Sequence, residues 1–232
     1  MRIHKDVYFL LAIGAFFLPF FMFDRLFDAY YRFNLEHGLV MSFIKFFFLA
    51  TLGEVIGLRI RTGRYHRQGF GLLPRAIVWG FLGVSIYMAF AIFASGTPLL
   101  LEKIGFRDAT ALLHSGLSWK KVIVSFGIST ALNLFYAPVL MTFHKITDIH
   151  ILETGGTVKG FFSPIAFARI FEKINWEVQW NFVFKRTIPL FWIPAQTITF
   201  LLPEEYRVLF AAFLGIVLGV LLAIAALKSV GS

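Results

Sequence analysis

Residues 208–227 form an apolar run without a charged or amide side chain. At about 1.5 Å of rise per residue, a helix of this length crosses the roughly 30 Å hydrocarbon core of a bilayer. The rest of the chain is similar, since 58% of its 232 residues are hydrophobic and 15% are charged. This balance lies far from that of a soluble domain. We therefore expect an all-α integral membrane protein, because a helix pairs its own backbone groups in lipid.

Five further apolar segments precede this run. The six predicted hydrophobic segments are residues 7–23, 39–58, 76–101, 122–143, 188–202 and 208–227. The first follows a basic start but lacks the small-residue cleavage pattern of a secretory signal, so we interpret it as a retained helix. The whole chain, residues 1–232, is predicted to be a single polytopic membrane domain. It comprises a four-helix core, an N-terminal helix and a kinked C-terminal helical pair.

Prolines shape two of these segments. Pro138 is expected to kink the segment 122–143. Pro189 and Pro194 interrupt the segment 188–202, which would span only about 22 Å as a straight helix. This segment is therefore either re-entrant or crosses a locally thinned bilayer. Residues 164–186 are predicted to form an amphipathic interfacial helix, anchored in the headgroup plane by Trp176 and Trp180.

The charges predict an orientation rather than a nucleic-acid partner. The net charge is +9, and five arginines without an intervening acid follow the second segment: Arg59, Arg61, Arg64, Arg67 and Arg75. Under the positive-inside rule the distribution favours two cytoplasmic termini. We expect a bilayer with anionic headgroups as the partner, in a bacterial cytoplasmic membrane or, alternatively, the mitochondrial inner membrane.

Little in the sequence indicates catalysis. The chain has no cysteine and no HExxH, GxSxG or P-loop spacing, so we expect neither an enzyme nor a cofactor. Four metal-capable side chains follow one another after the fourth segment: His144, Asp148, His150 and Glu153. Only the first two would share a helical face, so no metal site is predicted.

Three polar side chains interrupt otherwise apolar segments: Glu54, Asn133 and Gln196. Polar groups inside spans usually face a bundle interior or a cavity, so these three are candidates for a pore lining or polar path. Alternatives stay open. Glu54 lies near the end of its span and can reach interfacial water or a nearby arginine. Asn133 and Gln196 can instead hydrogen-bond between helices.

Small and hydroxylated residues indicate where helices pack closely. A polar stripe on the fourth segment is expected to bond mainly to a neighbouring helix: Ser125, Ser129, Thr130 and Asn133. Two glycine pairs have small-xxx-small spacing: Gly53 with Gly57, and Gly215 with Gly219. We interpret these pairs as contacts within one chain, with dimerisation as the alternative.

The proline-rich stretch near the C-terminus carries a motif. Its members are Trp192, Pro194, Gln196, Phe200, Pro203, Tyr206 and Arg207. In this order they resemble the hallmark of the Mpv-seventeen / peroxisomal-membrane-protein (PMP-twenty-two) family, with weaker echoes at Gly53-Glu54, Gly80-Phe81 and Lys121. Pro194 is displaced from the tryptophan, and Thr199 stands where the family has asparagine. The resemblance implies a divergent, bacterial member of this family.

The resemblance implies channel-like permeation of small solutes, and the polar residues in the spans agree with it. The alternative is a non-catalytic accessory subunit that packs against a larger membrane complex. A homo-oligomer stays open in either case. One residue of the motif has two interpretations: Arg207 either pairs with Glu204 or Glu205 at the surface, or folds back onto backbone carbonyls.

Overall fold

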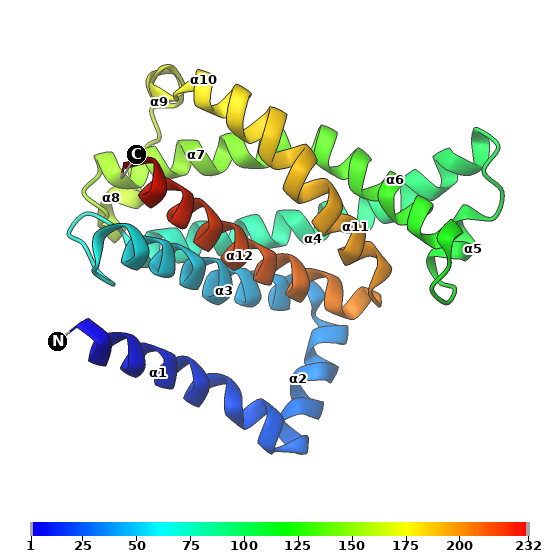
Figure 1. Cartoon of the computed structure of the whole chain (residues 1–232), viewed down its shortest axis with the longest axis horizontal. Coiled ribbons are helices and arrows are strands. Elements are labelled where there is room, and N and C mark those ends of the chain that lie inside the picture. Colours follow the sequence, from blue (N-terminus) through cyan, green and yellow to red (C-terminus); the bar gives the residue numbers. More distant parts are fainter. Residues whose placement is uncertain (1, 231–232) are drawn as a thin grey trace. The chain divides into compact units, whose positions relative to one another are not determined.

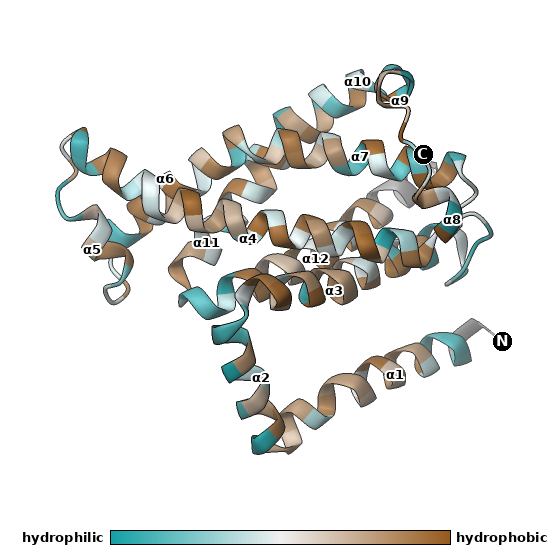
Figure 2. Cartoon of the chain, turned by 180° about the vertical axis from the view of Figure 1, so that it is seen from behind, coloured by the Kyte–Doolittle hydropathy of each residue, from teal (hydrophilic) through white to brown (hydrophobic). Residues whose placement is uncertain are grey.

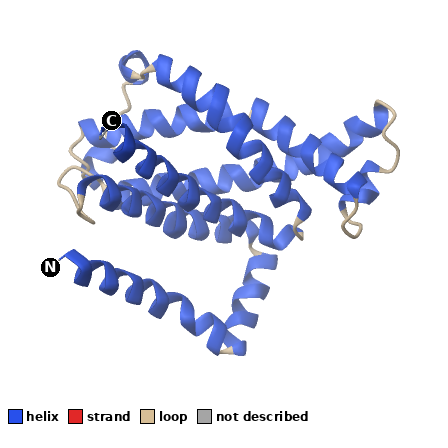
Figure 3. Cartoon of the chain, viewed as in Figure 1, coloured by secondary structure: helices blue, strands red, loops and turns tan. Residues whose placement is uncertain are grey.

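The computed structural model describes the backbone of residues 2–230 and the side-chain surroundings of residues 4–224. Helices make up nearly all of this part of the chain, which contains no strand (Figure 3). The all-α fold is therefore confirmed. The chain divides into two compact units, Met1–Met41 and Ser42–Ser232. The single membrane domain over residues 1–232 stays a prediction.

The first unit consists mainly of two helices, α1 (Arg2–Met22) and α2 (Asp24–Glu36). Helix α1 covers the predicted segment 7–23. It ends because Phe23 takes an extended backbone conformation, with φ −121° and ψ 101°. Helix α2 occupies residues for which the sequence predicts no element, and none of its side chains is buried.

The second unit contains the long helices that carry the candidate site (Figure 1). They are α3 (Gly38–Thr62), α4 (Leu72–Lys103), α6 (Trp119–Phe135), α7 (Ala137–Glu153) and α12 (Glu204–Val230). They cover the predicted segments 39–58, 76–101, 122–143 and 208–227. Residues 225–227 of the last segment lie in α12, but their side chains fall outside the described residues. Two short helices, α5 (Ala109–Leu113) and α8 (Val158–Phe161), lie in the connections.

Four helices in the described part of the chain are long and apolar enough to cross a membrane. These are His4–Met22, Gly38–Thr62, Leu72–Lys103 and Glu204–Ile224. The α6–α7 pair is a fifth candidate, bent by 43° at Tyr136, just before the proline expected to kink it. In the second unit the helices are mostly hydrophobic along their middles, and hydrophilic residues gather near the connections (Figure 2).

The structure corrects the predicted interfacial helix over residues 164–186. Helix α9 (Phe167–Lys173) ends at Ile174, whose backbone is extended, and α10 (Trp176–Val178) then begins with Asn175 as its cap. The Asn175 Oδ1 atom accepts a hydrogen bond of 3.0 Å from the Val178 backbone N–H. Ile170 and Ile174 are buried against Ile146 of α7, so this part of the predicted apolar face packs on the protein itself.

The segment 188–202 belongs to a longer helical stretch than expected. A π-helix, η1 (Gln179–Trp192), follows α10 directly and passes into α11 (Ile193–Leu201) without a break in helical backbone. Pro194 lies at the transition from η1 to α11, where it lacks the N–H that a continuous helix would use. Pro189 lies inside η1. The segment is not among the helices that are long and apolar enough to span on their own.

The hydrophobic core lies where α3, α4, α6, α11 and α12 meet. Its largest fully buried side chain is Phe200 of α11, whose ring lies 5.1 Å from the Phe90 ring of α4. Ile128 of α6 and Ala212 of α12 belong to the same cluster, and neither has exposed surface. Helix α11 thus holds the centre of the second unit, against α6 on one side and α12 on another.

Candidate functional site

The second unit encloses a cavity of about 780 Å³. Residues of α3, α4, α6, α7 and α12 line it, together with the junction of η1 and α11. All three polar residues predicted for a polar path are among them. Glu54 comes from α3, Asn133 from α6 and Gln196 from α11. The fold therefore brings together side chains that lie up to 142 positions apart, since 196 − 54 = 142.

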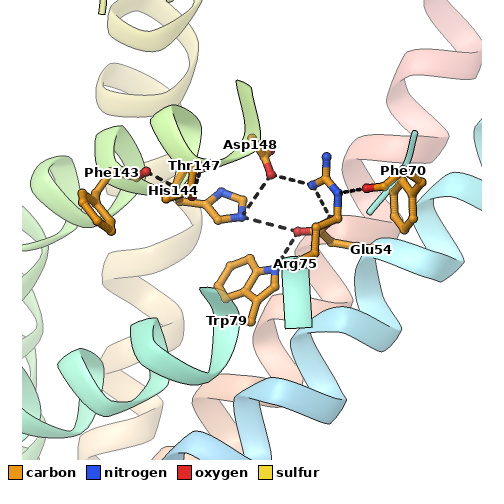
Figure 4. Close-up of polar contacts among 8 residues, drawn as sticks. All are labelled: Glu54, Phe70, Arg75, Trp79, Phe143, His144, Thr147 and Asp148. Carbon is orange, nitrogen blue, oxygen red and sulfur yellow. Dashed lines mark hydrogen bonds and ion pairs between the residues drawn. The ribbon is translucent and has the colours of Figure 1, made fainter. Parts of the chain in front are cut away.

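Glu54 is the centre of a cluster of polar contacts (Figure 4). Its Oε2 atom lies 2.6 Å from Nη1 of Arg75, and its Oε1 accepts a 2.6 Å hydrogen bond from the Trp79 indole N–H. Both partners come from α4, where they lie one helical turn apart. Glu54 thus contacts an arginine, one of the interpretations that the sequence left open, while it also lines the cavity.

Helix α7 adds a second carboxylate and a histidine. Asp148 Oδ1 lies 2.5 Å from the same Nη1 atom of Arg75. His144, one turn earlier, places its Nε2 atom 3.4 Å from Glu54 Oε1 and 3.8 Å from Asp148 Oδ1. The cluster therefore joins α3, α4 and α7 through one arginine that lies between two carboxylates.

Local structure fixes the position of Arg75. Its Nε atom donates a 2.7 Å hydrogen bond to the Phe70 carbonyl oxygen, and its guanidinium lies 4.8 Å from the Phe70 ring centroid. Gly71 precedes α4 with φ +69°, a left-handed conformation that suits glycine. With 7% of its surface exposed, Arg75 is buried, so its carboxylate partners are needed to offset the loss of hydration.

The turn that carries Arg75 is also locked to the end of α7. A Cβ atom on Gly71 would lie 3.0 Å from the Gly156 Cα, and a Cβ on Gly156 would lie 2.6 Å from the Gly69 carbonyl oxygen. Both Gly71 and Gly156 have positive φ. Larger residues do not fit at these two positions without a shift of the backbone.

The same cluster has the ligand types of a metal site, but a side-chain cation already lies between its carboxylates. One ligand atom each from Glu54, His144 and Asp148 lies within 4.8 Å of the others. The Arg75 guanidinium already takes the place of a cation between the two carboxylates. A metal ion would have to displace this buried arginine, so we assign none.

The remaining metal-capable residues of the sequence are placed elsewhere. The His150 Nε2 atom lies 3.2 Å from the Phe161 carbonyl oxygen. Glu153 forms ion pairs with Arg169, at 3.1 Å, and with Lys173. His150 and Glu153 therefore do not join His144 and Asp148.

The other end of the cavity is polar without being charged. Asn133 donates a 2.9 Å hydrogen bond to the Ser129 carbonyl, and the Ser129 hydroxyl donates a 2.7 Å bond to the Ile193 carbonyl of α11. The predicted bonding of this stripe between helices is thus confirmed for Ser129. The hydroxyls of Ser125 and Thr130 are buried without a hydrogen-bond partner among the described residues.

Two cavity-lining groups have unused hydrogen-bonding capacity. The indole N–H of Trp192 and the Oε1 atom of Gln196 are buried, and neither has a hydrogen-bond partner in the described structure. They lie one helical turn apart, one a donor and the other an acceptor. Both atoms are covered by protein in the described conformation, so a polar ligand or water can bond to them only after a side-chain rotation. Such a bond would offset the cost of about 1–3 kcal/mol that an unpaired buried polar group carries.

A second cavity, of about 130 Å³, lies at the other end of α4 and α12. Phe90 lines both cavities, and its ring contacts Phe200. Arg207 lines the second cavity and stacks over the Phe200 ring at 5.6 Å. Its Nε atom donates a 3.1 Å hydrogen bond to the Leu202 carbonyl, so the interpretation that it folds back onto the backbone is confirmed.

The other motif residues have separate places. Pro203 lies in the turn between α11 and α12, where its carbonyl accepts a 3.1 Å bond from the Tyr206 N–H. The Tyr206 side chain is exposed. Trp192, Gln196 and Arg207 therefore line the cavities, Phe200 is buried in the hydrophobic core, and Pro194, Pro203 and Tyr206 line neither cavity.

The two glycine pairs meet each other. A Cβ on Gly53 would lie 3.0 Å from the Ile216 Cα and 3.5 Å from the Gly215 carbonyl, and a Cβ on Gly219 would lie 3.4 Å from the Gly53 carbonyl. A Cβ on Gly57 would approach the Gly219 carbonyl to 3.7 Å. The interpretation that these glycines pack α3 against α12 within one chain is confirmed.

Comparisons with protein-family models, with curated proteins and with solved structures find no match for this chain. The site is therefore interpreted from its own chemistry.

The sequence indicates Glu54, Asn133 and Gln196, and leaves open an arginine contact for Glu54, but it does not indicate which arginine or the other partners of Glu54. Arg75 was interpreted only as a marker of orientation, and Trp79 was not considered. A signal was present in the spacing. Arg75 with Trp79, and His144 with Asp148, are pairs separated by four residues, which places each pair on one face of a helix.

Proposed function

We propose that this chain is a membrane-embedded permeation protein for small solutes, and that the cavity of about 780 Å³ is part of the solute path. The observation that carries the proposal is the convergence of Glu54, Asn133 and Gln196 on one cavity. A helical bundle without a polar path would be expected to fill this volume with apolar side chains.

The helices that surround the cavity support a membrane location for it. Three of them, α3, α4 and α12, are long and apolar enough to span, and the α6–α7 pair is a further candidate. In the proposed orientation both termini and the arginine-rich turn after α3 are cytoplasmic, in a bacterial inner membrane. The resemblance to the Mpv-seventeen / PMP-twenty-two family agrees with this function and stays part of the proposal.

Phe90 lines both this cavity and the second cavity, and we interpret it as the constriction between them. Phe90 and Phe200 are both buried, with 6% and 0% of their surfaces exposed. We interpret this arrangement as a closed state, in which permeation requires the Phe90 side chain to move. A rotamer change of one aromatic ring is a common way to open a hydrophobic constriction.

Solute flux from liposomes tests the proposal. The purified protein is reconstituted into vesicles loaded with sorbitol and raffinose, and the efflux of both is compared with protein-free vesicles. We expect sorbitol to leave faster with the protein, whereas the retained raffinose reports that the vesicles are intact. Planar bilayers provide a parallel readout of conductance. A folded protein that yields neither flux nor conductance would overturn the proposal.

The alternative role as an accessory subunit predicts a different outcome. A protein that packs against a larger complex should purify in mild detergent with a partner at a fixed ratio. An isolated monomer or homo-oligomer that supports flux excludes this alternative.

A further inference from the structure

We propose that the solute of this cavity is a small hydroxylated organic anion, which enters between Arg61 and Arg67 and bonds to Trp192 and Gln196 at the inner end. This inference rests on the proposed permeation function and adds the chemical class of the solute. Four cavity-lining residues carry it, two from the charged end and two from the neutral end.

The charge balance of the cavity is the first step. Its ionisable lining consists of Glu54, Arg61, Arg67, Arg75, His144 and Asp148. Within it, Arg75 is bound by both carboxylates, and Glu54 also accepts from Trp79. The two carboxylates share one fixed cation, and the whole lining, with three arginines and two acids, carries a net charge of +1 when His144 is neutral.

Two arginines remain. Arg61 and Arg67 are exposed residues at the cavity lining, and neither guanidinium has a hydrogen-bond or ion-pair partner within residues 4–224. Arg61 lies in the last turn of α3, and Arg67 lies in the turn that leads to α4. A concave surface with excess charge of one sign concentrates solutes of the opposite sign, here anions.

The turn holds Arg67 in an ordered place. The Arg67 carbonyl accepts a 3.0 Å hydrogen bond from the Phe70 N–H, and the Phe70 carbonyl in turn accepts the bond from Arg75 Nε. Gly156 of the α7 end packs against Gly69 and Gly71. The charge of Arg67 is therefore carried by a turn that backbone hydrogen bonds and glycine contacts hold in place.

The inner end adds the requirement for hydroxyl groups. Gln196 is buried, with 6% of its surface exposed, and its Oε1 atom is an acceptor without a donor in the described structure. The Trp192 N–H, one turn away, is a donor without an acceptor. A hydroxyl group both donates and accepts, so a polyol satisfies the two atoms together.

Three solutes with the same six-carbon polyol skeleton test which solute charge the cavity prefers. Gluconate is an anion, sorbitol is neutral and N-methyl-D-glucamine is a cation at neutral pH. Each is loaded into proteoliposomes, and its efflux is measured with potassium and valinomycin present to clamp the membrane potential. We expect gluconate to leave about tenfold faster than sorbitol, because a cleft of one charge raises the encounter rate of the opposite charge by this order. N-methyl-D-glucamine should be the slowest.

The arginine variants give the matched control. Arg61→Gln together with Arg67→Gln should reduce the ratio of gluconate efflux to sorbitol efflux from about ten to about one. Arg64→Gln alters an exposed arginine of the same turn that does not line the cavity, and it should change neither flux. If sorbitol or the cation leaves as fast as gluconate, the inference that the solute is an anion is wrong. The proposed permeation function is not affected by that result. If none of the three leaves faster than from protein-free vesicles, the permeation function itself is wrong.

A second pair of variants tests the inner end. Trp192→Phe removes the N–H and keeps an aromatic ring, so the gluconate concentration for half-maximal flux should rise severalfold. Trp180→Phe alters an exposed tryptophan outside the cavity and should leave it unchanged. An unchanged half-maximal concentration in Trp192→Phe would remove this residue from the solute contact.

Discussion

Arg75 of α4 and Glu54 of α3 form a part-buried ion pair, with 2.6 Å between Arg75 Nη1 and Glu54 Oε2. The same Nη1 atom contacts Asp148 of α7, so one guanidinium joins three helices around the cavity. The pair is not symmetrical. Arg75 has two carboxylate partners and a backbone carbonyl, whereas the loss of Glu54 leaves Arg75 with Asp148.

This asymmetry predicts the order of two substitutions. Arg75→Gln leaves two buried carboxylates without their cation and should lower the free energy of unfolding by about 3–5 kcal/mol. Glu54→Gln keeps the Arg75–Asp148 contact and should cost about 1.5–3 kcal/mol. Reversible unfolding in detergent micelles measures both, with Arg64→Gln as the surface control. A larger loss for Glu54→Gln than for Arg75→Gln would contradict the proposed asymmetry.

The glycine contact between α3 and α12 predicts a position-specific effect of alanine. Gly53→Ala places a methyl group 3.0 Å from the Ile216 backbone, and overpacking of this kind costs about 1–3 kcal/mol. Gly215→Ala is the matched control, because a Cβ there meets nothing within 4 Å. It should be neutral or stabilise by up to about 1 kcal/mol through helix propensity. Thermal unfolding of the two variants, side by side, provides the test. Equal melting temperatures would count against a close helix contact at Gly53.

Two serines of α6 allow a test of the bond to α11. Ser129→Ala removes the hydroxyl that donates to the Ile193 carbonyl and should cost about 0.6–1.7 kcal/mol, as interhelical hydrogen bonds in membranes do. Ser125→Ala removes a hydroxyl that is equally buried but unpaired, and it should be neutral or stabilising. The difference between the two free energies of unfolding is the decisive quantity. If both variants lose the same stability, the hydrogen bond is not the cause.

The ring between the two cavities predicts a gain of flux. Phe90→Ala removes the side chain that lines both cavities, so sorbitol efflux from proteoliposomes should rise severalfold above that of the unaltered protein. Truncation of a buried phenylalanine costs about 3–5 kcal/mol, so flux is measured well below the melting temperature of the variant. Phe93→Ala, on the same helix but outside both cavities, is the control for this loss of packing. Unchanged flux in Phe90→Ala would exclude Phe90 as the constriction.

The sequence predicts the long apolar helices well, because their signal is local. The charge-free run 208–227 and the segments 39–58 and 76–101 each become one helix within a few residues of their predicted ends. The bend before Pro138 is also a local effect, since proline removes a backbone donor. Polar residues in such runs are conspicuous, which is why Glu54, Asn133 and Gln196 could be selected.

The parts that the sequence could not predict depend on partners far along the chain. The pairing of Arg75 with both Glu54 and Asp148 depends on which faces of α3, α4 and α7 meet, and hydrophobic periodicity does not contain this information. The prediction of one helix over residues 164–186 was wrong because Asn175 caps the start of a new helix. The apolar spacing continues past this residue and gives no sign of the break. The π-helix η1 also has no signature in the apolar pattern.

The contact of Gly71 with Gly156 makes the arginine turn and the C-terminal end of α7 one mechanical body. A displacement of this turn would therefore shift the C-terminal end of α7, the helix that carries His144 and Asp148. In the proposed permeation protein, binding of a solute at Arg67 and the ion pair between Arg75 and Asp148 are then expected to influence each other.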